Sequence, residues 1–410
     1  MNCSFTGKPI ASVIIPICNI LALGKRTIKT PLRSFLIKMG RISWYIYPKK
    51  IKDTDILFIF STYDMGGAEK VHLDVVRAAR EYNCLIIFSR KSRDKHFLKE
   101  YKKLTKTIDI SPVTEFILGR YLMVGYMQKI IENSKVKIVV ASLGGFFYDI
   151  ASSLQKKDIL LIDILHAFDG VIEYYGLPAV RSIDKRVVID RTTEKSLEIL
   201  YEQNNIPSKY LERIEYIGNG VNIPSIKPKK GFGKQLNILF VGRDVKVKRV
   251  HIVKQVAQKY KKYYNALNTV LVGVEENNNI DKTYQAVGKI EDVMPFYEEA
   301  DILLIASERE GFPMVVMEAM VHGVIPICTD VGGINMHIQD GVNGFLVKEK
   351  DEEKIVDEFV EIISKLDQNR SKLRDISANA YNYAKEEFSI EKFDSKYNEL
   401  FKSCLQRSKI

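Results

Sequence analysis

The sequence predicts an α/β protein built from two doubly wound parallel sheets, and three observations support this. Short β-rich segments alternate with helical segments between Asp55 and Asp190. A second alternating series begins at Asn237, and a stretch rich in Gly, Pro and Lys over residues 219–235 separates the two series. Such alternation is typical of parallel sheets that are covered by helices.

Each series contains five segments that we expect to be strands. In the first series they are Ile56–Ser61, Cys84–Ser89, Lys137–Ala141, Ile159–His166 and Arg186–Asp190. In the second series they are Asn237–Val241, Thr269–Val272, Asp301–Ala306, Ile325–Thr329 and Gly344–Val347. The expected parts of the chain are a basic amphipathic extension (1–52), a first Rossmann-like domain (53–218), a linker (219–235), a second Rossmann-like domain (236–385) and a C-terminal helix (386–410). Ligands of such sheets bind outside the carboxyl ends of the strands, so we expect the active site in the cleft between the domains.

The positive charge of the chain belongs to its N-terminal extension. The formal net charge is +11, and the first 50 residues hold nine Lys or Arg and no acidic residue. The other 360 residues therefore carry only +2 (11 − 9). This distribution argues against a nucleic-acid-binding fold, which would carry its basic residues on a face of the folded domain.

The cysteines and apolar segments favour a cytoplasmic protein. The five cysteines show no CxxC spacing and no close pairs, so neither a zinc site nor a disulfide framework is indicated. The longest apolar run, Ile10 to Leu23, is interrupted by Pro16 and Asn19 and is shorter than the roughly 20 residues that span a bilayer.

Two carboxylates follow the strand that ends near Ala306. Glu310 lies in a polar loop, Pro313 suits the first position of a helix, and Glu318 lies on that helix. A carboxylate can accept hydrogen bonds from both hydroxyls of a ribose. Alone, this spacing favours two unrelated surface acids, so a functional meaning depends on the neighbouring segments.

Cations and glycines follow other strands of the second domain. Gly242 and Arg243 end one strand and Lys248 follows, a pair of cations suited to a pyrophosphate or, alternatively, a solvated helix start. Gly332 and Gly333 follow another strand, where we expect them to open a helix and expose backbone N–H groups, or to form a simple turn.

The first domain shows a related arrangement. Gly66 and Gly67 lie between the first strand and a helix, without the third glycine of a dinucleotide fingerprint, which argues against NAD. His166 stands at the carboxyl end of another strand, where a histidine is either catalytic or structural.

Together these segments resemble the retaining glycosyltransferases of family four, which have the two-domain GT-B fold. The resemblance runs from about Ile56 to Ser389. The segments that carry it are, in the family's order, Gly66-Gly67-Ala68-Glu69, His166, Asn219-Gly220-Val221, Val241-Gly242-Arg243 with Lys248, Gly288, Glu310 to Glu318, and Gly332-Gly333-Ile334. The sequence departs from the family's pattern after Arg243, where Asp-Val-Lys-Val replaces the usual Leu-x-x-Glu. It also departs at Arg249, where a small residue is common.

The resemblance implies that the first domain binds the acceptor and the second binds the nucleotide-sugar donor, and it implies a role for each of these segments. Arg243 and Lys248 would hold the diphosphate of the donor, and Glu318 its ribose hydroxyls. Glu310 would lie against the donor sugar. Backbone near Gly332, Gly333 and Ile334 would contact sugar or phosphate, Gly66 and Gly67 would approach the diphosphate across the cleft, and His166 would face the sugar and the acceptor.

The reaction implied is transfer of a sugar from a UDP- or GDP-sugar to a saccharide or polyprenyl-linked acceptor, with retention of configuration. Arg243, Lys248 and helix N-termini would stabilise the leaving diphosphate, so we expect no metal ion and no cofactor. Surface polysaccharide assembly (capsule, O-antigen or exopolysaccharide) is the expected setting. The alternatives are another reaction on a nucleotide sugar, such as epimerisation or phosphorolysis, and a non-catalytic nucleotide-sugar-binding protein.

The extension predicts one amphipathic helix that begins near Thr30. Its apolar face comprises Leu32, Phe35, Leu36, Met39, Ile42 and Ile46. Arg33, Lys38 and Arg41 lie away from that face. Two placements remain open, because residues 10–47 can lie on an anionic membrane at the inner face of the plasma membrane, or the helix can pack on the first domain.

Overall fold

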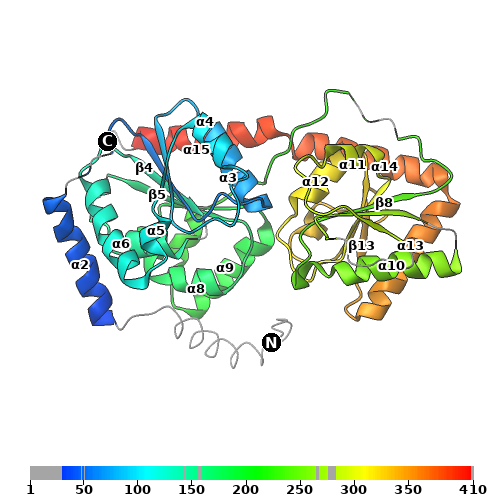
Figure 1. The fold of residues 1–410 in the computed structure, drawn as a ribbon, viewed down its shortest axis with the longest axis horizontal. Coiled ribbons are helices and arrows are strands. Elements are labelled where there is room, and N and C mark those ends of the chain that lie inside the picture. The colour runs from blue at the N-terminus through cyan, green and yellow to red at the C-terminus, as the bar shows by residue number, and fades with distance from the viewer. Residues whose placement is uncertain are drawn as a thin grey trace. The chain divides into compact units, whose positions relative to one another are not determined.

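The computed structural model describes residues 30–407, apart from residues 48, 50, 143, 156–157, 227, 229, 265–266 and 276–282. The chain divides into two compact units (Figure 1). The first unit comprises residues 30–188, 194–217 and 394–407, and the second comprises residues 189–193 and 218–393. The apolar run from Ile10 to Leu23 lies outside the described residues.

The first unit contains a parallel sheet of seven strands in the order β3-β2-β1-β4-β5-β6-β7. The strands are β1 (Ile56–Phe60), β2 (Cys84–Phe88), β3 (Lys106–Asp109), β4 (Ile138–Ser142), β5 (Leu160–Leu165), β6 (Lys185–Val188) and β7 (Ile214–Tyr216). The helices between them are α3 (Gly67–Ala78), α4 (Leu98–Leu104), α5 (Ser111–Thr114), α6 (Ile117–Glu132), α7 (Gly145–Ala151), α8 (Val171–Gly176) and α9 (Arg191–Gln203), with 3-10 helices η1 (Leu177–Ser182) and η2 (Ser208–Arg213).

Helices cover both faces of this sheet. Helices α6 and α7 pack their apolar residues on β1, β2 and β4 in one core. The last helix, α15 (Ile390–Arg407), brings Phe401 against Phe58 of β1. Helix α2 (Thr30–Ile46) packs on the outer side of α6 (Figure 1).

The second unit contains a parallel sheet of six strands in the order β10-β9-β8-β11-β12-β13. The strands are β8 (Asn237–Val241), β9 (Asn268–Val272), β10 (Gln285–Ala286), β11 (Ile302–Ile305), β12 (Ile325–Thr329) and β13 (Phe345–Val347). The helices are α10 (Val250–Tyr263), α11 (Met294–Glu299), α12 (Met314–Val321), α13 (Glu352–Gln368) and α14 (Arg370–Glu387), with 3-10 helices η3 (Lys246–Lys248) and η4 (Ile334–Met336).

Two apolar cores lie on opposite faces of the second sheet. One joins α10 and α13 to the strands, and the other joins α11 and α12. Helix α14 contributes to both, since Leu373 and Ile376 belong to the first core and Ala380 and Ala384 to the second.

The structure confirms the predicted α/β class with two parallel sheets and adds three strands to the ten predicted. The additional strands, β3, β7 and β10, are four, three and two residues long and lie at the edges of the sheets. Strand β3 is mostly exposed and reads Lys-Thr-Ile-Asp, so it has no continuous apolar run. An edge strand needs little apolar character, which is why the sequence pattern missed these three.

Candidate functional site

The predicted donor-binding residues follow three neighbouring strands of the second sheet. Strand β8 leads to Gly242 and Arg243, β11 leads to Glu310, and β12 leads to Gly332 and Gly333. Strands β8, β11 and β12 are adjacent in the sheet, and the strand order reverses between β8 and β11. Such a reversal is where parallel sheets of this class bind ligands at the carboxyl ends of their strands.

Lys248 and Glu310, predicted separately from two motifs, form an ion pair. The Nζ atom of Lys248 lies 2.5 Å from Oε1 of Glu310, and both side chains are only partly exposed. Lys248 is the last residue of η3, which follows β8, and Glu310 follows β11. The structure therefore brings the two predicted charges to one point at the edge of the sheet.

The loop after β12 is joined to the loop that carries Glu310. The backbone N–H of Gly333 donates to the carbonyl oxygen of Gly311 at 2.8 Å. Gly332 has a φ of +60°, and a Cβ there would collide with the Glu310 carbonyl oxygen and lie 2.8 Å from the carbonyl carbon. Only glycine allows both this backbone conformation and this close approach.

This arrangement differs from the one expected for the paired glycines. We expected a helix with exposed N–H groups after β12, but the segment is the three-residue 3-10 helix η4. The N–H of Gly333 is already engaged with Gly311, and that of Ile334 donates to Val331. The glycines thus hold two loops together, and their predicted contact with sugar or phosphate stays a prediction.

Arg249, the departure from the family pattern, is built into the same region. It adopts the left-handed conformation (φ +45°) at the start of α10. Its guanidinium donates to the carbonyl oxygens of Ala306, at 2.6 Å, and Ser307, at 3.1 Å. The side chain therefore tethers the end of β11, a role that a small residue in this position could not fill.

The end of β8 leaves Arg243 accessible. A Cβ on Gly273 would lie 3.0 Å from the Gly242 carbonyl carbon, so β9 and the end of β8 approach closely there. The Arg243 side chain is exposed, and within the part of the chain that the structure describes it makes no ion pair. A guanidinium in this position is available to an anionic ligand.

Glu318 is positioned by a residue that the sequence did not indicate. The hydroxyl of Tyr297, on α11, donates to Oε2 of Glu318, on α12, at 2.9 Å. Tyr297 is fully buried and stacks on His322, and burial raises its pKa well above the usual value, so the hydroxyl keeps its proton. No motif marks a tyrosine 21 residues before a glutamate, because the contact depends on the packing of two helices.

In the first unit, Gly66 and Gly67 lie at the corresponding point of the sheet. They follow β1, and the strand order reverses between β1 and β4. Helix α3 begins at Gly67 without a side-chain cap at Gly66. The Glu69 carboxylate folds back beside Gly66 and accepts a hydrogen bond from Thr62 Oγ1 at 3.0 Å. Gly66 and Gly67 thus lie between the first strand and a helix, as predicted, and the structure adds that the amino end of α3 lies at the reversal point.

His166 follows β5 in this unit and pairs with a second histidine. Its Nε2 lies 2.8 Å from Nε2 of His72, a buried residue of α3 that stacks on Phe60 at 4.4 Å. Burial lowers the pKa of His166 to about 4 and that of His72 well below its usual value, so both rings are neutral at pH 7. One ring therefore donates its N–H and the other accepts.

The surroundings favour His72 as the donor in this pair. The Nδ1 atom of His72 is buried and has no partner among the described residues. A buried N–H without a partner is rarer than a buried acceptor without one, so the proton of His72 belongs on Nε2. His166 then carries its proton on Nδ1 and can donate it to a ligand. No motif in the sequence indicated His72.

Within the described residues, no group of three or more His, Cys, Asp or Glu side chains is arranged to hold a metal ion. The charged groups that the structure gathers in the second unit are instead Lys248 and Glu310, with Arg243 on the adjacent strand end. Two of these three groups are cations, which suit an anionic ligand.

Comparison with known proteins relates the second unit to a known family. Residues 222–383 match the family of glycosyl transferases group 1. N-acetyl-alpha-D-glucosaminyl L-malate synthase of Bacillus anthracis is 28% identical over 199 residues, which cover 46% of this chain and 51% of that protein. The capsular polysaccharide biosynthesis glycosyltransferase CapM of Staphylococcus aureus is 28% identical over 199 residues, covering 43% of this chain and 50% of that protein. The matches thus span about half the length of these relatives.

A solved structure extends the likeness in fold to both units. HepE of Anabaena, crystallised with UDP and glucose, superposes with a TM-score of 0.69 at 17% identity, covering 85% of this chain and all of that one. At this identity the match shows the fold alone. The two parallel sheets and this superposition show that the chain has the GT-B fold, and residues 222–383 of the second unit match the group 1 glycosyl transferases.

Proposed function

We propose that the chain transfers a sugar from a nucleotide-diphosphate sugar to a saccharide or lipid-linked saccharide acceptor, with retention of the anomeric configuration. The observation that carries the proposal is the Lys248–Glu310 pair at the strand ends of the second sheet, with Gly332 and Gly333 joined to the same loop. The presence of UDP in the HepE structure supports a nucleotide-sugar donor.

In the proposed reaction, negative charge develops on the leaving diphosphate. Arg243 and Lys248 stabilise that charge in place of a metal ion, because fixed cations in a partly desolvated site cost little reorganisation. Glu318, held by Tyr297, accepts hydrogen bonds from the ribose hydroxyls. Glu310 lies beside the sugar and keeps Lys248 in place.

Retention is proposed to follow attack on the same face as the leaving group. The leaving phosphate takes the acceptor proton, and no covalent glycosyl-enzyme is formed. In the first unit, His166 is neutral and is proposed to donate its Nδ1–H to the sugar or acceptor rather than to act as a base. Exclusion of water around these groups would limit hydrolysis of the donor.

We propose surface polysaccharide assembly as the setting, at the inner face of the plasma membrane. The relative named for capsular polysaccharide biosynthesis supports this choice. The basic extension supports a location close to anionic lipid, since residues 1–50 contain nine basic residues and no acidic one.

A two-step experiment tests the proposal. A thermal-shift screen of UDP- and GDP-sugars first selects the donor, because a ligand that binds only the native state raises the Tm. Donor consumption is then measured with and without saccharide acceptors, in the presence of EDTA. Transfer that needs the acceptor and resists EDTA is expected; acceptor-independent conversion indicates an epimerase or phosphorylase-like reaction, and binding without turnover indicates a non-catalytic protein.

Variants of the ion pair provide a sharper test of the site. Lys248→Ala and Glu310→Ala should each nearly abolish turnover while the protein stays folded. Lys365→Ala is a matched control, because Lys365 forms an equally short pair with Glu361 on an exposed surface of α13. Turnover near the wild-type rate in either site variant would refute the assignment.

A further inference from the structure

Helix α2 is fixed on the first unit by its glycine- and arginine-bearing side. A Cβ on Gly40 would lie 2.8 Å from the Leu122 carbonyl carbon of α6, and a Cβ on Gly125 would lie 2.8 Å from that of Ile37. The two helices thus meet backbone to backbone at these glycines. Such close packing requires residues without side chains at the crossing.

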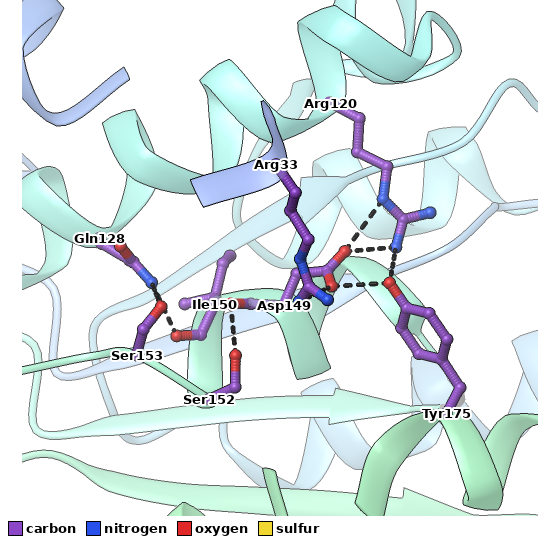
Figure 2. Close-up of polar contacts among 8 residues, drawn as sticks. All are labelled: Arg33, Arg120, Gln128, Asp149, Ile150, Ser152, Ser153 and Tyr175. Atoms are coloured by element: carbon purple, nitrogen blue, oxygen red, sulfur yellow. Dashed lines mark hydrogen bonds and ion pairs between the residues drawn. The ribbon is translucent and has the colours of Figure 1, made fainter. Parts of the chain in front are cut away.

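A buried carboxylate holds the same side of α2. Asp149 of α7 is 1% exposed and accepts hydrogen bonds from Arg33 of α2 at 2.8 Å, Arg120 of α6 at 2.6 Å and the Tyr175 hydroxyl at 2.6 Å (Figure 2). At the other end of α2, Arg41 forms a two-fold ion pair with Glu132 of α6, at 2.9 and 2.8 Å. Rotation of α2 would leave Asp149 with one cation fewer, and an underpaired buried charge is costly.

The predicted apolar face of α2 therefore points away from the protein. Of its six residues, only Leu36 is buried. The others are 40% to 65% exposed, namely Leu32, Phe35, Met39, Ile42 and Ile46. Arg33 and Arg41 lie away from this face, as predicted, but their side of the helix faces the fold. The helix thus packs on the first unit, which is one of the two placements left open by the sequence, and still leaves its apolar face uncovered.

The exposed apolar residues continue onto the start of α6. Leu122, whose backbone meets Gly40, is itself exposed, and Leu118 lies one turn earlier on the same side of α6. Phe116, directly before α6, is 71% exposed. We call Leu32, Phe35, Met39, Ile42, Ile46, Phe116, Leu118 and Leu122 the α2–α6 apolar surface.

We propose that the α2–α6 apolar surface lies on an anionic lipid bilayer and attaches the protein to the membrane as a peripheral protein. Among the described helices, none has the length and apolar content needed to cross a bilayer. An interfacial helix places its apolar face in the lipid boundary and keeps cations beside it. Lys38 and Lys49 are exposed, and the exposed side chains of Tyr45 and Tyr47 stand at the end of α2, where aromatic residues suit the headgroup region.

Charge favours lipid over a second copy of the chain as the occupant. Residues 1–29, which lead into α2, carry Lys8, Lys25, Arg26 and Lys29 and no acidic residue. Two copies that met at this surface would bring two sets of like charges together, whereas an anionic bilayer complements them. The inference rests on the proposed function only in that a lipid-linked acceptor would be found at the same membrane.

Vesicle flotation of the full chain tests the inference without donor or acceptor. The vesicles are phosphatidylcholine alone or with phosphatidylglycerol. The test variant combines Phe35→Ser, Met39→Ser and Ile42→Ser. The control combines Ile199→Ser, Ile226→Ser and Val342→Ser, which are also exposed apolar residues outside the α2–α6 apolar surface. All six are exposed, so folding should persist, and the circular dichroism spectrum and Tm verify it.

The wild-type chain and the control should float with the phosphatidylglycerol vesicles, and the bound fraction should fall at high salt. The test variant should lose binding at least tenfold. Equal flotation of wild type and test variant, or no flotation of the wild type, would overturn the inference. Light scattering that shows a wild-type dimer and a monomeric test variant would assign the surface to a second copy instead. If vesicle binding behaves as expected but no donor is consumed, only the proposed function fails.

Discussion

Replacing Gly332 with alanine should separate the loops of the donor site without unfolding the second unit. The added Cβ would collide with the Glu310 carbonyl oxygen, lie 2.8 Å from its carbonyl carbon and lie 3.1 Å from the Gly311 carbonyl oxygen. The loops must move apart by roughly 1 Å before these atoms reach ordinary contact distance. Glu310 and its partner Lys248 would move with them.

Two energetic effects of Gly332→Ala can be separated. The left-handed backbone at φ +60° costs about 1 kcal/mol for alanine, and loss of the hydrogen bond from Gly333 to Gly311 costs about 1 kcal/mol more. The Tm should therefore fall by several degrees only, since about 1 kcal/mol lowers the Tm of a domain of this size by roughly 2–4 °C. A displacement of about 1 Å at the reacting centre costs about 100-fold in rate.

Gly341→Ala provides the matched control, because Gly341 has a φ of +72° but nothing within 4 Å of the added Cβ. The assay is kcat/KM for the donor selected by thermal shift, with the Tm measured in parallel. Gly332→Ala should lose about 100-fold in kcat/KM, and Gly341→Ala should stay within about threefold of wild type while it shows the same backbone strain. If both variants keep near-normal turnover, the close approach of the two loops does not position Glu310, and the reasoning fails.

Three further predictions concern contacts inside the units. Tyr297→Phe removes the hydrogen bond to Glu318 and should raise the donor KM about fivefold, for a loss of about 1 kcal/mol, with kcat nearly unchanged; an unchanged KM would contradict the positioning role. Burial raises the pKa of the Glu173 carboxyl in the folded state to about 7. Between the ordinary pKa of a glutamate and pH 7, the folded state therefore keeps a proton that the unfolded state releases. The stabilisation of the folded state by this proton is present at low pH and is lost as the pH rises through 7. Glu173→Gln should therefore raise the Tm relative to wild type at pH 8 and leave it nearly equal at pH 5, and a difference confined to pH 5 would refute the sign. His72→Phe keeps a ring against Phe60 but removes the donor to His166, so ¹⁵N NMR should show His166 losing its preference for the Nδ1–H tautomer; an unchanged tautomer would exclude control by His72.

Local sequence patterns predicted most of the fold and the neighbourhood of the donor site. Buried strands read as apolar runs, so all ten predicted strands are present, and the residues that follow them fall at the carboxyl edges of the sheets. Parallel strands place those edges together, which is why Lys248 and Glu310, 62 residues apart in the chain, could be expected near one another.

The tertiary structure decided how those residues are held. The sequence pattern predicted that Gly332 and Gly333 begin a helix. In the structure they instead contact the loop that carries Glu310 and connect the loops that follow β11 and β12. Tyr297 reaches Glu318, and His72 reaches His166, through packing between elements that no spacing rule connects. The supporting partners of a site are therefore set by side-chain packing, which one sequence does not show.

Helix α2 shows the same division between what the sequence determines and what the tertiary structure decides. Periodicity in the sequence determined that α2 is amphipathic and which residues form its apolar face. The direction of that face depended on Asp149 and Glu132, which lie about a hundred residues further along the chain. Because a buried carboxylate needs a charged partner, Arg33 and Arg41 of α2 face the first unit, and the apolar face of the helix remains exposed.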